Sequence, residues 1–444
     1  MAGRNPLETY DFRDPDGTTV NVRVRRPSSD GRWTFFRGKG CTAQVYFFIG
    51  MDVAGHTVKS FYRIPASDMP EFGFSIHPGS VSKWEQIKIM DLPKPVSDFV
   101  QVADLDQIHM DICNLNADIW KSMTEEDQDK LLKRAFAYHR TLGFPFTTIP
   151  SDKRLASEIE EIRRYQPNGK DLPIENAGLG FCSAYMPHRF KSRNVNSDFS
   201  AWEAFWDDEV FMKVLKSSAS WKNPTLTRPG IRSALGALRR TPTQFRPAVM
   251  KALVDTYCSA GGLVFDPCAG WGGRLMGALV SGRTYLGVEP IKETADALYR
   301  MGARLCEHLG LDRGVFRILE GMIQATPTEG INADFAMTSP PYWTQEIYSG
   351  GDKGDPTLEN WTADFLKPLF EKTRKALKPE ACFAVNISDV KTSKGVVIPL
   401  ESLTVKTAQD CGFMLEGTWR MLKASFGNQE SGRYEPILIF RRLG

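Results

Sequence analysis

The feature that most constrains the fold of this chain is an alternation that begins near Gly261. From there, short apolar runs of strand length alternate with segments of helical length. The first run, residues 263–267, has the sequence Leu-Val-Phe-Asp-Pro and leads through a glycine-rich turn into an apolar segment at residues 275–280. Strands that alternate with helices are typical of βαβ units, which form a parallel sheet covered by helices. We therefore expect an α/β fold in the C-terminal part of the chain.

The N-terminal part of the chain has a different character. The whole chain has 444 residues, which is the length of two or three domains. Residues 1–95 contain runs of strand type at 20–25, 45–50 and 60–65, each bounded by Gly, Pro, Asp or Ser. These runs predict a β-rich N-terminal domain.

Two further segments complete the expected organisation. Residues 96–244 have helical periodicity and predict a helical segment between the β-rich domain and the α/β domain at 245–444. Near the end, β-like runs at 413–420 and 436–441 flank a stretch rich in Gly and Asn. They predict an antiparallel hairpin that closes the sheet.

Composition excludes several classes of protein. A hydrophobic content of 42% with 25% charged residues is ordinary for a globular protein, and no run of about 18 apolar residues predicts a transmembrane helix. The first residues lack the apolar core of a signal peptide, and the eight cysteines include no CxxC pair. We therefore expect a cytoplasmic protein with no metal site. The net charge of +3 neither requires nor excludes a nucleic-acid partner.

A glycine-rich turn follows the strand predicted at residues 263–267. Gly270 and Gly272 allow a ligand to approach the backbone closely, and the next helix offers free N–H groups at its N-terminus. About twenty residues later a second predicted strand ends in Glu289, and an acid at that point commonly binds ribose hydroxyls. A tight turn with no ligand is the alternative, but the acid favours a bound nucleoside.

A second unusual segment is Thr338-Ser339-Pro340-Pro341-Tyr342. Consecutive prolines do not occur inside helices or central strands, and the preceding residues 333–337 predict a short buried strand. The segment is therefore expected to be a rigid loop at the end of a strand, where α/β sheets bind ligands. Its hydroxyl, carbonyl and aromatic ring suit a planar group that carries an amine, whereas a simple rigid turn is the alternative.

These segments together resemble the motifs of a known enzyme family. The turn at 266–272, the acid Glu289 and the loop at 338–342 are similar to those of the S-adenosylmethionine-dependent DNA amino-methyltransferases, as in bacterial and phage-encoded modification methylases. The resemblance covers about residues 245–442. It implies a class I, Rossmann-like methyltransferase domain with a seven-stranded sheet and a C-terminal antiparallel hairpin.

The resemblance also implies roles for individual residues. Asp266 and the glycine loop would contact the methionine part of S-adenosylmethionine, and Glu289 would hold its ribose. Glu320 is a substitute for the acid that the family often places beside the adenine, because Met322 occupies that region here. The implied cofactor-binding residues are Phe245, Asp266, Pro267, Cys268, Gly270, Gly272, Glu289, Pro290, Glu320 and Met322.

In the resembled family the Ser-Pro-Pro-Tyr loop performs the chemistry. The Ser339 hydroxyl and the Pro340 carbonyl would accept hydrogen bonds from the target amine, and Tyr342 would stack on a base flipped out of double-stranded DNA. The implied catalytic residues are Ser339, Pro340, Pro341 and Tyr342. Methylation at carbon 5 of cytosine would need a cysteine in this loop, and the loop contains none.

The target of the reaction stays open between several alternatives. Ser rather than Asp before Pro-Pro-Tyr favours the N4 amine of cytosine, with the N6 amine of adenine as the next candidate. Methylation of an amine in RNA is a further reading. A catalytically silent nucleic-acid-binding protein that keeps the cofactor pocket for stability is the alternative from a different class. The sequence gives neither the recognition sequence nor the oligomeric state.

Target recognition is expected upstream of residue 240, because little room exists between or after the two motifs. One basic and aromatic cluster suits contact with phosphates, and a solvated basic face is its alternative reading. The nucleic-acid-binding residues predicted there are Arg189, Lys191, Arg193, Arg232, Arg239 and Arg240. A second basic group lies between Arg23 and Lys39 in the β-rich domain. That domain faintly resembles restriction-endonuclease cores, but its strand at 20–26 carries no acid, so we expect a DNA-binding or scaffold role without cleavage.

Overall fold

The computed structural model divides the chain into two units, Met1–Asp98 and Phe99–Gly444. In the first unit it describes only the backbone of six short strands. In the second it describes residues 102–194, 197–238, 241–343, 346–347, 357–391, 395–423 and 433–444. The division of the chain at 95 and 244 stays a prediction.

The first unit contains a mixed four-stranded sheet in the order β1-β2-β4-β5. Strand β2 pairs in parallel with β4, and the outer pairs are antiparallel. The strands expected at 20–25, 45–50 and 60–65 are confirmed as β2, β4 and β5. The bounds are β1 (Thr9–Arg13), β2 (Thr19–Arg25), β3 (Trp33–Phe35), β4 (Val45–Met51), β5 (Val58–Pro65) and β6 (Phe74–Ile76). The side chains of this unit, including the basic group between Arg23 and Lys39, lie outside the described residues.

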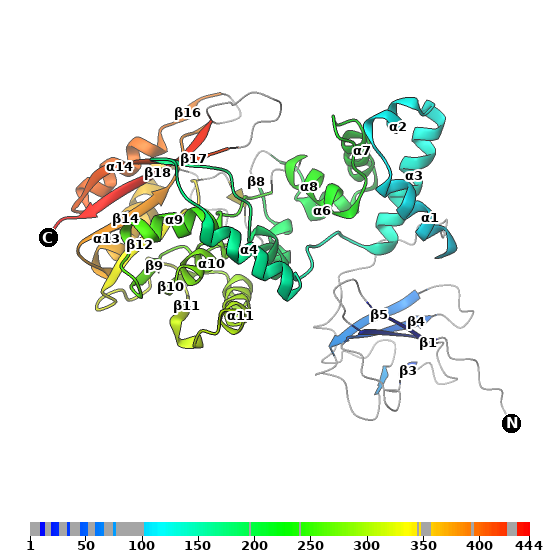
Figure 1. Ribbon diagram of the computed structural model, residues 1–444, viewed down its shortest axis with the longest axis horizontal. Helices are drawn as coiled ribbons and strands as arrows, with labels where there is room; N and C mark the ends of the chain where they lie inside the picture. Colours follow the sequence, from blue (N-terminus) through cyan, green and yellow to red (C-terminus); the bar gives the residue numbers. More distant parts are fainter. Residues whose placement is uncertain are drawn as a thin grey trace. The chain divides into compact units, whose positions relative to one another are not determined.

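The second unit is built on an eight-stranded sheet in the order β11-β10-β9-β12-β14-β18-β17-β7 (Figure 1). The first five strands are parallel, and β18 and β17 form an antiparallel hairpin at the end of the chain. This arrangement confirms the predicted α/β fold of the class I methyltransferase type, with the two-residue strand β7 added at one edge. The bounds are β7 (Asp171–Leu172), β9 (Leu263–Asp266), β10 (Thr284–Glu289), β11 (Phe316–Glu320), β12 (Ala333–Thr338), β14 (Leu377–Asn386), β17 (Phe413–Leu422) and β18 (Tyr434–Arg442).

Alternating side chains of the sheet enter two separate cores. Val264 packs in one core and its neighbour Phe265 in the other, as the period of two in a strand requires. The helices on the first face are α4 (Asp152–Arg164), α5 (Leu179–Tyr185), α9 (Pro247–Tyr257), α10 (Gly273–Val280) and α11 (Lys292–Leu309). The second face carries α12 (Leu358–Trp361), the π-helical turn η5 (Thr362–Leu366), α13 (Lys367–Ala376) and α14 (Leu400–Asp410).

Glycines bring α9 unusually close to α10. A Cβ atom on Gly273 would lie 1.8 Å from the Phe245 carbonyl oxygen, and one on Gly277 would lie 2.4 Å from that of Pro247. Both glycines therefore allow backbone contact that any side chain would prevent. This packing places Phe245 beside the glycine-rich turn.

The remaining helices form a third hydrophobic cluster, away from the sheet, around Phe205, Phe211 and Leu235. Its members are α1 (Val102–Cys113), α2 (Ala117–Ser122), α3 (Glu125–Leu142), α6 (Ala201–Trp206), α7 (Asp208–Ala219) and α8 (Arg228–Leu238). The predicted helical segment is therefore shared between two cores, because α4 and α5 pack on the sheet instead. None of the helices in the described part of the chain has the length and apolarity needed to cross a bilayer.

Candidate functional site

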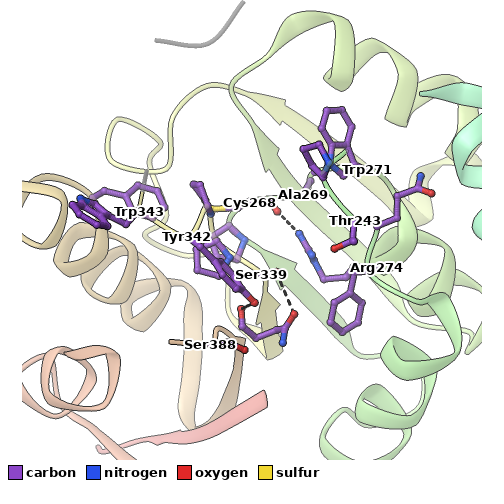
Figure 2. Close-up of a pocket in the computed structure, with 18 of the residues that line it drawn as sticks. Thr243, Cys268, Ala269, Trp271, Arg274, Ser339, Tyr342, Trp343 and Ser388 are labelled. Atoms are coloured by element: carbon purple, nitrogen blue, oxygen red, sulfur yellow. Dashed lines mark hydrogen bonds between the residues drawn. The ribbon is translucent and has the colours of Figure 1, made fainter. Parts of the chain in front are cut away.

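One cavity of about 1120 Å³ lies at the C-terminal ends of the parallel strands. Both sequence motifs line it: Gly270 and Glu289 from the β9 and β10 ends, and Ser339 and Tyr342 from the loop after β12. Figure 2 shows Trp343 and Tyr342 toward one side of the cavity and Trp271 and Arg274 toward the other, with Cys268 and Ser339 between them. Small-molecule sites typically measure about 300–1,000 Å³, so this cavity slightly exceeds the usual range.

The carboxylate of Asp266 faces the protein interior. It is 0% exposed, and its Oδ2 atom accepts hydrogen bonds from Arg274 Nε and from the Tyr285 hydroxyl, both at 2.7 Å. The same guanidinium also donates to the Cys268 carbonyl. Asp266 does not line the cavity and shapes the glycine-rich turn through Arg274, and the contact with a cofactor that the resemblance implies for it stays a prediction.

Glu289 is buried at the end of β10 and receives two backbone donors. Its Oε2 atom accepts from Gly270 N at 3.0 Å, and its Oε1 atom accepts from Ile291 N at 3.1 Å. Burial raises the pKa of this carboxyl to about 7. Each oxygen keeps a further lone pair, so the side chain is able to accept hydrogen bonds from a ligand in the cavity.

The side of the cavity next to Glu289 is mainly apolar. Pro290, Ile291 and Met322 line it, and Met322 is 60% exposed. Glu320 does not line the cavity and lies 3.7 Å from Lys292 Nζ on the surface. The acid proposed as a substitute beside an adenine is thus directed elsewhere in this structure.

Of the other residues predicted to bind a cofactor, Phe245, Pro267 and Cys268 line the cavity and Gly272 does not. Gly272 is instead the N-cap residue of α10, with φ of 85°. Desolvation raises the pKa of the Cys268 thiol to about 12, so the thiol stays protonated at neutral pH. A protonated thiol is a poor nucleophile, which agrees with a binding rather than a reacting position.

In the loop after β12, the carbonyl groups of the two prolines differ in their hydrogen bonding. Trp343 N donates to the Pro341 carbonyl at 3.0 Å, and Trp343 has φ of 47°, a rare conformation for an aromatic residue. No donor from the described residues reaches the Pro340 carbonyl. Pro340 therefore offers an acceptor that a ligand is able to use.

Two hydroxyl groups of the same loop are fixed by the end of β14 and by β18. The Ser339 hydroxyl donates to Asn386 Oδ1 at 3.3 Å. The Tyr342 hydroxyl lies 3.1 Å from the Asn386 carbonyl oxygen and 3.0 Å from Glu435 Oε1, and either oxygen accepts its proton. These contacts hold the tyrosine ring at the wall of the cavity.

Four buried polar atoms of the cavity wall have no hydrogen-bond partner among the described residues. They are Thr241 Oγ1, Gln244 Nε2, Trp343 Nε1 and Ser388 Oγ. Buried polar groups are normally paired, so each of these atoms is available to a ligand or to water. Gln244 is oriented by the Ser183 hydroxyl, which donates to its Oε1 at 2.7 Å.

Four of the predicted nucleic-acid-binding residues lie in the described part of the chain, Arg189, Lys191, Arg193 and Arg232, and none of these four lines the cavity. Arg189 donates to the Pro242 carbonyl at 2.7 Å, and burial lowers its pKa to about 10. Arg232 donates to the Pro145 and Phe146 carbonyls at 3.3 and 3.5 Å. Both arginines therefore brace the protein's own backbone.

The other members of that cluster differ in their surroundings. Lys191 Nζ lies 5.8 Å from the centre of the Trp202 ring, and Arg193 donates to the Ser197 carbonyl. Arg239 and Arg240 lie outside the described residues. Lys191 and Arg193 stay candidates for contact with a polyanion.

Four residues of the site carry no sequence signal that motif reasoning used: Arg274, Gln244, Asn386 and Glu435. Arg274 could have been identified from the sequence, because it follows the glycine-rich turn directly and lies eight positions after Asp266, the buried acid with which it pairs. Asn386 and Glu435 become relevant only when the fold brings β14 and β18 beside the loop.

No protein-family model and no curated protein matches this sequence. Among solved structures, it is similar to a 1,6-didemethyltoxoflavin-N1-methyltransferase from Burkholderia thailandensis with bound S-adenosylhomocysteine (12% identity, 45% of this chain and 78% of that chain, TM-score 0.32). It is also similar to a putative sarcosine dimethylglycine methyltransferase from Galdieria sulphuraria (14% identity, 48% and 88%, TM-score 0.31). A third is a putative RNA methyltransferase from Pyrococcus horikoshii (16% identity, 45% and 83%, TM-score 0.28). Likenesses this distant say nothing about the substrate of this chain.

Proposed function

We propose that this protein transfers a methyl group from S-adenosylmethionine to an exocyclic amine of a base in DNA. The glycine-rich turn after β9 and Glu289 at the end of β10 together form what we call the cradle. The observation that carries the proposal is that this cradle and the Ser-Pro-Pro-Tyr loop line one cavity. Methyl transfer requires the donor and the acceptor to lie side by side, and a cavity of about 1120 Å³ has room for both.

The cradle fits S-adenosylmethionine by the chemistry of its groups. The Glu289 carboxylate is placed to accept hydrogen bonds from ribose hydroxyls. Pro290, Ile291 and Met322 offer an apolar surface for an adenine ring. At the other end, the unpaired Gln244 Nε2 is a donor suited to an amino-acid carboxylate. When bound, the cofactor supplies an electrophilic methyl group.

The loop supplies the acceptor side of the reaction. The Ser339 hydroxyl and the Pro340 carbonyl accept the two amine hydrogens, so the nitrogen lone pair is drawn out of conjugation with the base. The Tyr342 ring lies under the base and fixes its plane. Positioning and these hydrogen bonds lower the barrier without a covalent intermediate. As the new N–C bond forms, the S–C bond of the donor breaks and leaves S-adenosylhomocysteine, and the methylated nitrogen would release one of its two protons to water.

DNA is the proposed polymer because the pair of motifs resembles enzymes that act on DNA. The N4 amine of cytosine is the preferred atom, since serine precedes the two prolines. An amine buried in a duplex is out of reach of such a cavity, so the base must leave the stack first. The N6 amine of adenine and amines in RNA present the same donor hydrogens, and a silent binder would use the same surfaces without reaction.

A nucleoside digest separates these candidates. The protein is incubated with S-adenosylmethionine labelled at the methyl group and with unmodified double-stranded DNA, with RNA, or with no polymer. The polymer is then digested to nucleosides and the labelled product is identified by chromatography. We expect N4-methyldeoxycytidine from the DNA sample and no label elsewhere.

Each other outcome has a defined meaning. Labelled N6-methyldeoxyadenosine would keep the DNA proposal and change the base. Label in RNA alone would refute the DNA proposal. An absence of label, with S-adenosylhomocysteine binding intact by calorimetry, would favour the silent binder. The variant Glu289→Gln is a matched control, because its labelling of DNA should fall by the same factor as its affinity for the cofactor.

A further inference from the structure

The Ser339 hydroxyl has one proton and two lone pairs, so its role depends on where the proton points. A hydroxyl that accepts a hydrogen bond from an amine must donate its own proton to another group. In this structure the Ser339 oxygen lies 3.3 Å from Asn386 Oδ1, which accepts its hydrogen bond. The oxygen's lone pairs are then left for the cavity.

The Asn386 amide has only one orientation that satisfies its surroundings. Its Nδ2 atom donates to the Pro436 carbonyl at 3.0 Å, and a flipped amide would place two oxygens against each other there. Oδ1 must therefore face Ser339. The side chain is 3% exposed, which protects this arrangement from competing water.

We propose that Asn386 is a positioning residue that makes Ser339 a hydrogen-bond acceptor for the target amine. The inference rests on the proposed amino-methyltransferase function and deepens it. In the proposed chain of hydrogen bonds, the amine donates to the Ser339 hydroxyl and Ser339 donates to Asn386 Oδ1. Asn386 Nδ2 in turn donates to the Pro436 carbonyl. The 3.3 Å separation is longer than a strong hydroxyl bond, and such contacts commonly shorten when substrate binds.

The first test is a double-mutant cycle between Asn386→Ala and Ser339→Ala, with transfer measured in a single turnover on unmodified DNA. Removing an acceptor for a neutral hydrogen bond should slow transfer about tenfold in Asn386→Ala. In the Ser339→Ala background the same substitution should have no further effect, because its target hydroxyl is gone. Affinity for S-adenosylhomocysteine and the unfolding midpoint show whether Asn386→Ala remains folded.

The second test uses Asn386→Asp, which carries one donor and one acceptor only when its carboxyl is protonated. We expect slow transfer at pH 8, because an ionised carboxylate has no proton to donate to the Pro436 carbonyl and is repelled by it, which displaces the acceptor from Ser339. Transfer should recover relative to wild type as the pH falls toward 5.5, because burial raises the pKa of an introduced carboxyl. The wild type is titrated in parallel to remove contributions from Tyr342, Glu435 and Lys423, which lie near the network.

Several outcomes would overturn the inference. If Asn386→Ala transfers as fast as wild type, or slows transfer equally with and without the Ser339 hydroxyl, Asn386 does not act through Ser339. A flat ratio of Asn386→Asp to wild type between pH 5.5 and 8 would also contradict it. If the wild type labels no polymer, the proposed function itself fails and the inference falls with it.

Discussion

The two walls of the cavity are stabilised in different ways. In the cradle, the decisive contacts join residues 8 to 19 positions apart, from Asp266 to Arg274 and from Gly270 to Glu289. The Ser-Pro-Pro-Tyr loop is instead fixed by residues 47 and 93 positions away, in β14 and β18. The cradle is thus a local structure, whereas the geometry of the loop depends on the closure of the whole sheet.

This difference separates binding from chemistry. Changes within the cradle should alter stability and cofactor affinity, because its polar groups bond to one another. Changes at the loop should alter the rate of transfer and leave the cradle unaffected. The predictions below test that separation, in order of decreasing free-energy effect.

The largest effect is expected for Arg274→Met. It leaves the fully buried Asp266 carboxylate without its cationic partner, and loss of one member of a buried pair costs about 3–5 kcal/mol. The free energy of unfolding from urea titrations should fall by that amount, and affinity for S-adenosylhomocysteine should weaken. Arg300→Met, on the exposed face of α11, is the control and should change stability by less than about 0.5 kcal/mol. Equal effects of the two substitutions would show that the ion pair does not support the cradle.

A smaller but more selective effect is expected for Tyr342→Ala. Stacking of one base on an aromatic ring contributes about 1–3 kcal/mol, so single-turnover transfer should slow by up to about 100-fold. Cofactor affinity should not change. Tyr342→Phe keeps the ring and removes only the contacts to Asn386 and Glu435, so it should slow transfer less than tenfold. Full activity of Tyr342→Ala would refute stacking on this ring.

The third prediction concerns the backbone packing that positions Phe245. In Gly273→Ala the new Cβ would lie 1.8 Å from the Phe245 carbonyl oxygen, so α9 must move away from α10. Overpacking of this kind costs about 1–3 kcal/mol, although alanine has the higher helix propensity. Gly180→Ala in α5 has open space around its Cβ and should be neutral or stabilising. If the unfolding midpoints of Gly273→Ala and Gly180→Ala changed by the same amount, the result would contradict the packing argument.

The contrast between the two walls also explains what the sequence was able to predict. The strands, the hairpin and the cradle follow from local patterns, and the β9–α10 turn and Glu289 lie where the pattern placed them. The partners of Ser339 and Tyr342 could not be predicted, because they depend on the pairing of β14 with β18. In the sequence, Arg189 and Arg232 resembled part of a phosphate-binding cluster. Only the fold shows that their guanidinium groups donate hydrogen bonds to backbone carbonyls instead.

The smallest effect concerns the protonation of Glu289 in the cradle. Burial raises the pKa of this carboxyl to about 7, so in the free protein it is mostly protonated at pH 6 and mostly ionised at pH 8. The ionised form is the better acceptor for ribose hydroxyls. Ligand binding should therefore favour ionisation and lower the pKa, because hydrogen bonds to a carboxylate stabilise its charged form.

It follows that affinity for S-adenosylhomocysteine should rise as pH increases from 6 to 8, by at most about tenfold, which is the change in the ionised fraction across a pKa of about 7. Calorimetry near pH 6.5 in buffers of different ionisation enthalpy should detect proton release on binding. Glu289→Gln keeps the shape of the side chain without the titration, so its weaker affinity should be independent of pH. A pH-dependent affinity that persisted in Glu289→Gln would place the titrating group outside the cradle, and tighter binding at low pH would mean that the protonated acid is the binding form.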